Sequence, residues 1–173
     1  NSIVRALDNR KANVVDNAKY PVFEVKQKHD VVIIIGGGSS VVEHLEGVKN
    51  FIETFDNPVL VFATARHAAL FEDVACTKVY ALVGTESKRL SANVDSSNFS
   101  DIAILPPYPR TMGTDVPEFA AANTYELDAI TFTDSYLDSC TTLAVQTAMD
   151  VANDTIYCVG YDGYPGNVLS EKE

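Results

Sequence analysis

Residues 31–41 read VVIIIGGGSSV, and this stretch decides the fold. Its first five residues are all branched and apolar, without the alternation of a strand that has one wet face, which is typical of a parallel strand covered on both sides. The glycines and serines that follow mark a turn from strand to helix, where the backbone can approach a ligand closely. Residues 31–36 are therefore predicted to form a buried parallel strand that ends in a glycine turn.

Apolar runs and helical patterns alternate along the rest of the chain. Residues 41–55 carry apolar side chains three to four positions apart, which predicts an amphipathic helix that ends before Pro58. The polar residues 85–100 receive no element, and the proline-rich residues 106–118 are predicted to be a loop. The other predicted elements are strands at 59–63, 78–84, 102–105, 127–132 and 155–160, and helices at 67–73 and 135–152. This order favours an α/β fold, a three-layer Rossmann-like domain with a mainly parallel sheet.

The first residues have the pattern of an amphipathic helix, with Ile3, Val4 and Leu7 on one face. We therefore expect the chain to be a piece of a longer protein. Residues 1–28 are interpreted as a linker and the end of a preceding domain's helix, and residues 29–173 as the Rossmann-like domain.

The net charge of −11 is unevenly distributed. Residues 111–173 hold eleven acidic residues and one basic residue, whereas residues 1–110 are nearly balanced at −1. The acidic part should repel nucleic acids and anionic membranes over a Debye length. The sequence thus predicts no nucleic-acid partner and no membrane partner, and an anionic ligand should dock on the N-terminal part.

The three cysteines are scattered, and the three histidines form no HxxxH pattern. This spacing argues against a disulfide framework and a metal site, and it favours a reducing, cytoplasmic location. No apolar run reaches the roughly 18 residues needed to span a bilayer. We expect no cofactor and no metal in this domain, and the sequence leaves a homodimer open.

Several polar residues follow the predicted strands, at the edge of a parallel sheet where ligands usually bind. Four of the predicted strands contribute candidates: the glycine turn Gly36, Gly37, Gly38, Ser39 and Ser40 follows the first, Thr64 and Arg66 the second, Thr85 the third and Asp162 the last. The backbone amides of the turn would bind a phosphate, Arg66 could pair with it, and Asp162 could accept ribose or sugar hydroxyls.

Each of these candidates also has a structural interpretation. Ser39 or Ser40 could cap the following helix, with Glu43 completing a capping box. Arg66 could face solvent at a helix start, and Asp162 with the glycine after it could form a common turn. Two familiar phosphate-binding motifs do not fit, because no Lys-Ser/Thr pair follows the glycines and Val41 stands where a dinucleotide fingerprint has its third glycine.

Other polar residues carry weaker signals. Arg110, in the proline-rich loop, could reach a ligand or simply be solvated. Asp134 is predicted to cap the long helix, in whose first turns Ser139, Thr141 and Thr142 would act as caps or ligand contacts. Cys140 has no nearby histidine to activate it and is interpreted as a small core residue.

Two stretches resemble a known pattern. VVIIIGGGSSVVEHLEGVKNFIE resembles the GxGPSL opening of the motility-accessory and hydroxymethylpterin-pyrophosphokinase-like family and of the sialyltransferases that use CMP-activated sugars. SYLDSCTTLAVQTAMDVANDTIYCVGYDGY resembles their second signature, a small-residue helix followed by a strand that ends in Gly-x-Asp. Gly36, Gly38 and Ser40 match the first motif, with Ser39 in place of its proline, and Asp162 matches the second. The resemblance implies nucleotide or nucleotide-sugar binding more than transfer chemistry, because this chain has no counterpart of a sialyltransferase histidine base.

A second resemblance lies at the start of the chain. NSIVRALDNRKAN is similar to the closing helix and linker of bacterial aldolase-like proteins related to 4-hydroxy-2-oxovalerate aldolase and HMG-CoA lyase. Some of these, often in surface-polysaccharide contexts, carry a glycine-rich α/β domain after the aldolase barrel. The resemblance implies that this chain is such a C-terminal domain and that the aldolase's lyase chemistry and its divalent metal belong to the barrel.

Taken together, the patterns favour a domain that recognises a nucleotide, a nucleotide sugar or a sugar phosphate. Whether the domain is itself an enzyme stays open. A small glycosyl- or pyrophosphoryl-transferase is the first alternative, and it would need carboxylates such as Asp134, Asp162 and Glu86 to converge beside the turn. A structural or dimerising domain without a ligand is the second alternative.

Overall fold

The computed structural model describes residues 19–110, 113–135, 137 and 139–162. Six parallel strands form one sheet in the order β5-β4-β3-β2-β1-β6. The strands are β1 (His29–Ile35), β2 (Val59–Phe62), β3 (Thr77–Ala81), β4 (Ile102–Leu105), β5 (Thr124–Glu126) and β6 (Ala152–Val159). The expectation of a three-layer Rossmann-like α/β fold is confirmed.

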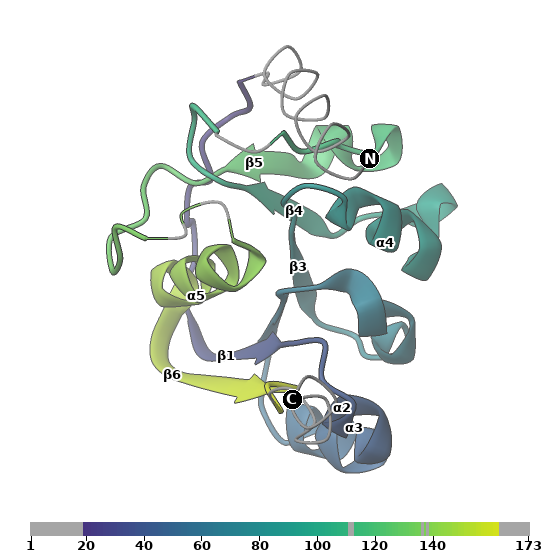
Figure 1. Ribbon diagram of the computed structural model, residues 1–173. Helices are drawn as coiled ribbons and strands as arrows, with labels where there is room; N and C mark the ends of the chain where they lie inside the picture. Colours follow the sequence, from purple (N-terminus) through teal and green to yellow (C-terminus); the bar gives the residue numbers. More distant parts are fainter. Residues whose placement is uncertain (1–18, 111–112, 136, 138, 163–173) are drawn as a thin grey trace, which may run out of the picture.

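Helices cover both faces of the sheet (Figure 1). One face carries α2 (Ser40–Glu43), α3 (Leu45–Glu53), η1 (Ala65–Phe71) and α4 (Glu86–Asn93), and the other carries α5 (Cys140–Val151). Two short 3-10 helices, η2 (Ser96–Asn98) and η3 (Glu118–Asn123), precede β4 and β5 respectively in the chain. Among the described residues, no helix is long and apolar enough to cross a membrane.

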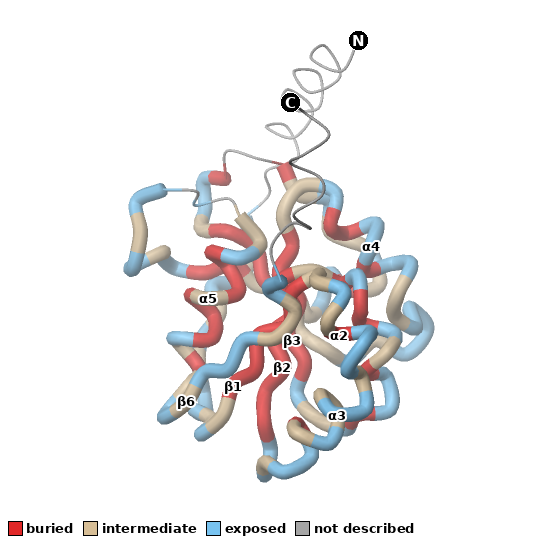
Figure 2. The backbone as a smooth tube through the Cα atoms, turned by 60° about the horizontal axis from the view of Figure 1, so that its bottom comes forward, coloured by how far each residue is buried: buried red, intermediate tan, exposed pale blue. Residues whose placement is uncertain are grey.

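The alternation of side chains along β1 divides the core in two. Ile33 and Ile35 pack with α3 and η1, whereas Val32 and Ile34 pack with α5. All four are at most 1% exposed, and the central strands form the most deeply buried part of the molecule (Figure 2). The continuous apolar run in the sequence thus reflects burial on both faces, as expected for a parallel strand.

The chain order places a topological switch point between β1 and β6. From β1 the chain steps outward through β2, β3 and β4 to β5, and α5 then carries it back across the sheet to β6 on the other side of β1. The carboxyl ends of β1 and β6 therefore mark the part of the sheet edge where α/β proteins usually bind ligands.

The structure differs from the sequence prediction in several stretches of the chain. The polar residues 85–100, left without an element, contain α4, whose buried face consists of Glu86, Ser87 and Leu90. One apolar residue gives no periodicity to recognise, which is why the helix was missed. The strand predicted at 127–132 lies earlier, at Thr124–Glu126, and the helix predicted over 41–55 is divided into α2 and α3 at His44.

The start of the long helix was also misplaced. The helix begins at Cys140 rather than at residue 135, and its N-cap is Ser139, whose hydroxyl accepts from the amide of Thr142. Asp134 is exposed and lies outside the helix, so the prediction that it caps α5 was wrong.

Residues 20–25, assigned from sequence to a linker, lie beside β5. Val22 forms a parallel bridge with Glu126, and the Phe23 amide donates to the Glu126 carbonyl at 2.8 Å. Phe23 and Val25 also pack against the core on the α5 side of the sheet. This segment therefore covers the edge of the sheet that β5 would otherwise expose. Residues 1–18 of the predicted linker lie outside the described residues.

Arg110 is a buried structural residue, which answers the question that its loop position raised. Its Nη1 lies 3.0 Å from Glu126 Oε2, and both side chains are 3% exposed. The same Glu126 oxygen accepts from the Tyr20 amide at 3.2 Å, and Arg110 also donates to the Pro106 carbonyl at 3.3 Å. This ion pair therefore holds the proline-rich loop and residues 20–25 against β5.

Removing one partner of this pair should strongly destabilise the fold. We expect Arg110→Met to lower the free energy of unfolding by about 3–5 kcal/mol, because it leaves the Glu126 carboxylate buried without its cation. The double variant Arg110→Met/Glu126→Leu should recover part of this loss. Urea denaturation measures both, with Lys49→Met as the control.

Lys49 pairs with Asp73 at 2.7 Å, but the Asp73 side chain is 74% exposed. The control should therefore leave the free energy of unfolding almost unchanged. An Arg110→Met variant as stable as the Lys49→Met variant would contradict the structural role of the buried pair.

Candidate functional site

The glycine turn packs directly against the end of β6. The Gly36 amide donates to the Val159 carbonyl and the Gly38 amide to the Gly160 carbonyl, both at 2.8 Å. Gly160 has a φ of +77°, in the left-handed region that favours glycine. The turn after β1 and the chain leaving β6 are thus joined main chain to main chain.

This close approach explains two of the three glycines without a ligand. A Cβ at Gly36 or at Gly38 would lie 2.6 Å from the Gly160 carbonyl oxygen, nearer than real Cβ contacts allow. At Gly37 the nearest atom would be the Thr64 methyl group, at 3.1 Å. Gly37 therefore faces Thr64 rather than β6, and packing demands glycine there less strictly.

Asp162 closes the turn from the β6 side. One of its carboxylate oxygens accepts from the Ser40 amide at 2.8 Å, and the other accepts a short hydrogen bond from the Ser40 hydroxyl. These bonds, above all the one from the hydroxyl, lower the pKa of Asp162, with smaller contributions from His44 and His67. The carboxylate is exposed and ionised at neutral pH.

The predicted capping box at this helix is absent. Ser39 is the N-cap of α2 but makes no side-chain capping bond, and the Ser40 hydroxyl is engaged by Asp162. Asp162, far away in sequence, accepts from the Ser40 amide, which Glu43 would have served in a capping box. The structure therefore brings Gly36–Ser40 and Asp162 together as the sequence analysis predicted, but as direct partners of each other.

Arg66 lies over the glycine turn from the β2 side. Its Nη1 donates to the Gly37 carbonyl at 3.3 Å, and its side chain is exposed. Thr64 accepts from the Arg66 amide at 3.3 Å and so caps η1. Both residues therefore lie beside Gly37, at the open side of the turn.

His67, which the sequence analysis did not propose as a site residue, supports the glycine turn by hydrogen bonding. Its Nε2 lies 3.2 Å from the carbonyl oxygens of both Gly37 and Gly38, and the nitrogen must donate because carbonyls only accept. The side chain is 7% exposed. A single histidine near the start of a helix forms no recognisable sequence pattern. Only its position shortly after β2, at the carboxyl edge of the sheet, could have suggested this role.

Glu86 connects the ends of β2 and β3. Its Oε1 accepts from the Thr64 hydroxyl at 2.6 Å and from the Ala65 amide at 2.8 Å, and its Oε2 pairs with Arg89 at 3.2 Å. Thr85, the N-cap of α4, makes no side-chain capping bond and is exposed, and no hydrogen bond joins it to the glycine turn in the described part of the chain.

Two other candidates lie at the start of α5. The Thr141 hydroxyl hydrogen-bonds with the Tyr161 side chain, and Tyr161 approaches Gly36. The Cys140 thiol points to the Ala81 carbonyl at 3.9 Å, and burial raises its pKa to about 11. Cys140 is therefore a neutral, packed thiol, in agreement with its interpretation as a core residue.

Of the three carboxylates considered for transfer chemistry, two are engaged by protein groups. Asp162 is bound to Ser40, Glu86 accepts from Thr64 and Ala65, and Asp134 is exposed outside α5. Within the described ranges, no group of three histidine, cysteine or acidic side chains could hold a metal ion. What this edge offers a ligand is an exposed carboxylate, the Arg66 guanidinium and free backbone amides.

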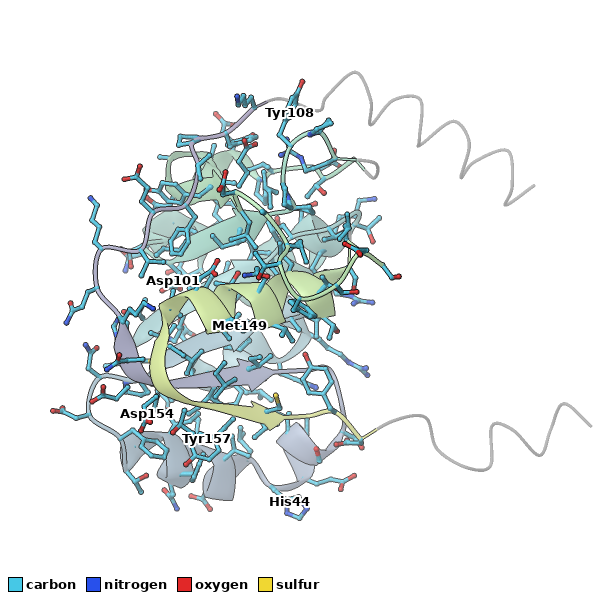
Figure 3. All side chains as sticks on the ribbon, turned by 90° about the vertical axis from the view of Figure 1, so that its left-hand side faces the viewer. His44, Asp101, Tyr108, Met149, Asp154 and Tyr157 are labelled. Atoms are coloured by element: carbon cyan, nitrogen blue, oxygen red, sulfur yellow. The ribbon has the colours of Figure 1, made fainter. Side chains whose placement is uncertain are left out.

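Asp162 also lines a hollow of about 330 Å³ between α2 and the end of β6, whose walls include Ser40, His44, Gly160 and Tyr161. His44 projects from the outer surface of this region (Figure 3). A larger, mostly apolar hollow of about 580 Å³ lies at the opposite edge of the sheet, beneath residues 21–27. The larger hollow is far from the polar residues described above, so the carboxyl edge is the better candidate site.

Fold and site together define a Rossmann-like α/β domain with a group of polar residues at its switch point. The chain matches no family model, no curated protein and no solved structure.

A glycine-to-alanine substitution is expected to have opposite effects at Gly38 and at Gly47. We expect Gly38→Ala to lower the free energy of unfolding by about 1–3 kcal/mol, since its Cβ would overlap the end of β6. Gly47→Ala, in α3 with nothing within 4 Å of the new Cβ, should raise it by about 0.5–1 kcal/mol. Thermal and urea unfolding measure both, and equal effects would contradict the packing of the turn against β6.

The bond between Asp162 and Ser40 predicts a pH dependence of stability. Because the pKa of Asp162 is lowered from 3.8 in the folded protein, its contribution is fully present above that value and is lost as the pH falls through the folded pKa. We expect Asp162→Asn to lower the melting temperature at neutral pH, and the difference should shrink in acid.

Melting curves from neutral to strongly acid pH test this expectation. Asp128→Asn is the control, because Asp128 is exposed and makes no hydrogen bond or ion pair with the described residues. A difference for Asp162→Asn that did not depend on pH would contradict the role of the ionised carboxylate.

Proposed function

We propose that this domain binds a nucleotide, a nucleotide sugar or a sugar phosphate at the carboxyl edge of its sheet. We further propose that it does so in the cytoplasm, as the C-terminal ligand-binding domain of a bacterial aldolase-like protein. The observation that carries the proposal is the meeting of the glycine turn, Arg66 and Asp162 at the switch point between β1 and β6.

The phosphate is expected on the Arg66 side of the turn. In the part of the chain that the structure describes, the Gly37 and Ser39 amides donate to no acceptor, whereas those of Gly36, Gly38 and Ser40 are all engaged. The guanidinium of Arg66 lies beside Gly37 and can fork onto two phosphate oxygens. The Asp162 carboxylate would repel a phosphate from the Ser40 side.

The hydroxyls of the ligand are expected at Asp162. An ionised carboxylate has about four lone-pair directions, and Ser40 uses two of them. The others can accept from ribose or sugar hydroxyls in the adjoining hollow. A ligand with a phosphate and a sugar thus matches the order of charges along the carboxyl edge, from the cation at Arg66 to the acceptor at Asp162.

A panel of CMP, CDP, UDP and ADP sugars, together with the free nucleotides and hexose phosphates, is tested by calorimetry and thermal shift. A true ligand at ten times its Kd should stabilise the fold by about 1.4 kcal/mol. Arg66→Met should weaken binding about 10-fold or more, because it removes a charge-assisted bond to phosphate.

Lys88→Met is the matched control, since Lys88 is an exposed cation of α4 and should leave the affinity unchanged. Absence of binding across the panel would overturn the proposal. So would binding that Arg66→Met and Lys88→Met affect equally.

A further inference from the structure

A second polar hollow, of about 380 Å³, lies away from the glycine turn. It is bounded by η1, by β3 and by the segment that runs from the end of α4 to the start of β4. Asp101, which lines it, lies where the strands begin, at the edge of the sheet opposite the glycine turn (Figure 3). Its volume falls in the lower part of the range of small-molecule sites, about 300–1,000 Å³.

Two buried donors from β3 line this hollow. Lys78 and Tyr80 lie two positions apart and therefore on the same face of the strand, and they are 8% and 2% exposed. The Tyr80 ring stacks on Phe62 with the centroids 4.8 Å apart, which fixes its position. Within the described ranges, neither the Lys78 ammonium nor the Tyr80 hydroxyl makes a hydrogen bond or an ion pair.

Buried donors without partners are costly, and native proteins nearly always satisfy them. Asp101 is the nearest candidate partner by register, because Val79 pairs with Ile102 and the preceding residues are therefore neighbours. Asp101 forms no ion pair with Lys78, although the charge of Lys78 lowers its pKa against a larger rise from burial. The hollow thus has two donors on β3, Lys78 and Tyr80, and an acceptor, Asp101, directly before β4.

The charges around the hollow restrict what can enter it. Among the described residues that line it, Lys78 is the one basic residue and Glu72, Asp95 and Asp101 are acidic, so these four side chains carry −2 when all are ionised. A phosphate or carboxylate would meet this negative charge, and a cation would meet the buried ammonium. A neutral ligand whose groups both donate and accept suits such a lining, and hydroxyl groups have this property.

We propose that this hollow binds a small uncharged polyol of monosaccharide size, with Lys78 and Tyr80 donating to its oxygens and Asp101 accepting from its hydroxyls. The Asn93 side-chain carbonyl, whose amide nitrogen donates to the Arg89 carbonyl at 2.8 Å, supplies a further acceptor. This site is independent of the one at the glycine turn, with which it shares no residue.

Titrations followed by backbone-amide NMR of the whole chain test the proposal. The probes are glucose, mannose, N-acetylglucosamine and sorbitol, with inorganic phosphate as the anionic probe. We expect at least one neutral probe to give saturable shifts at residues 76–80 and 93–101, and phosphate to give none there. Lys78→Met and Tyr80→Phe should each weaken binding about 5–30-fold.

The controls are Lys88→Met and Tyr157→Phe, which make the same chemical changes at residues outside the hollow. Tyr80→Phe keeps the ring that stacks on Phe62, and the amide spectrum of each variant shows whether it is folded. The proposal is overturned if no neutral probe gives saturable shifts up to its solubility limit. It is also overturned if phosphate alone binds, or if both hollow variants bind as tightly as the controls.

Discussion

The rest of the structure depends on the burial of β1 between β2 and β6. Its main chain is hydrogen-bonded on both sides, and its side chains from Val32 to Ile35 are almost fully buried on both faces. The chain that leaves β1 must therefore turn against the end of β6, close enough for direct main-chain bonds. That contact requires glycine at positions 36, 38 and 160, and it brings Asp162 to Ser40 across 122 positions of the sequence.

Several acidic side chains join separate segments of the fold. Asp162, Glu86 and Glu126 each accept a hydrogen bond from a backbone amide far away in sequence, and each therefore joins two segments. At Asp162 such bonds lower the pKa of the carboxyl group, because the amide dipole points its positive end at the carboxylate. At the carboxyl edge, the negative charge of Asp162 is accompanied by the cation of Arg66, whose guanidinium lies on the glycine turn.

Much of the fold could be predicted from local patterns. Continuous apolar runs indicated β1, β2 and β4, since a strand buried on both faces has no polar position to interrupt it. The same reasoning failed at β5, where Thr124 and Glu126 are buried but polar. The Thr124 hydroxyl donates to the nearby Ala120 carbonyl, whereas Glu126 is bound by Arg110 and by the Tyr20 amide. A partner that lies elsewhere in the chain leaves no mark on local periodicity.

The sequence by itself determined the strand–helix alternation, the parallel sheet and the edge at which polar residues gather, because burial on one or both faces imposes a period that can be read locally. Tertiary structure alone decided what each polar residue does there. Ser40 serves Asp162 instead of capping α2, His67 supports the turn, and Arg110 is buried rather than solvated. The reason is physical: a hydrogen bond or ion pair depends on which strand lies beside which, and the position of β6 next to β1 is settled only when the whole sheet has formed.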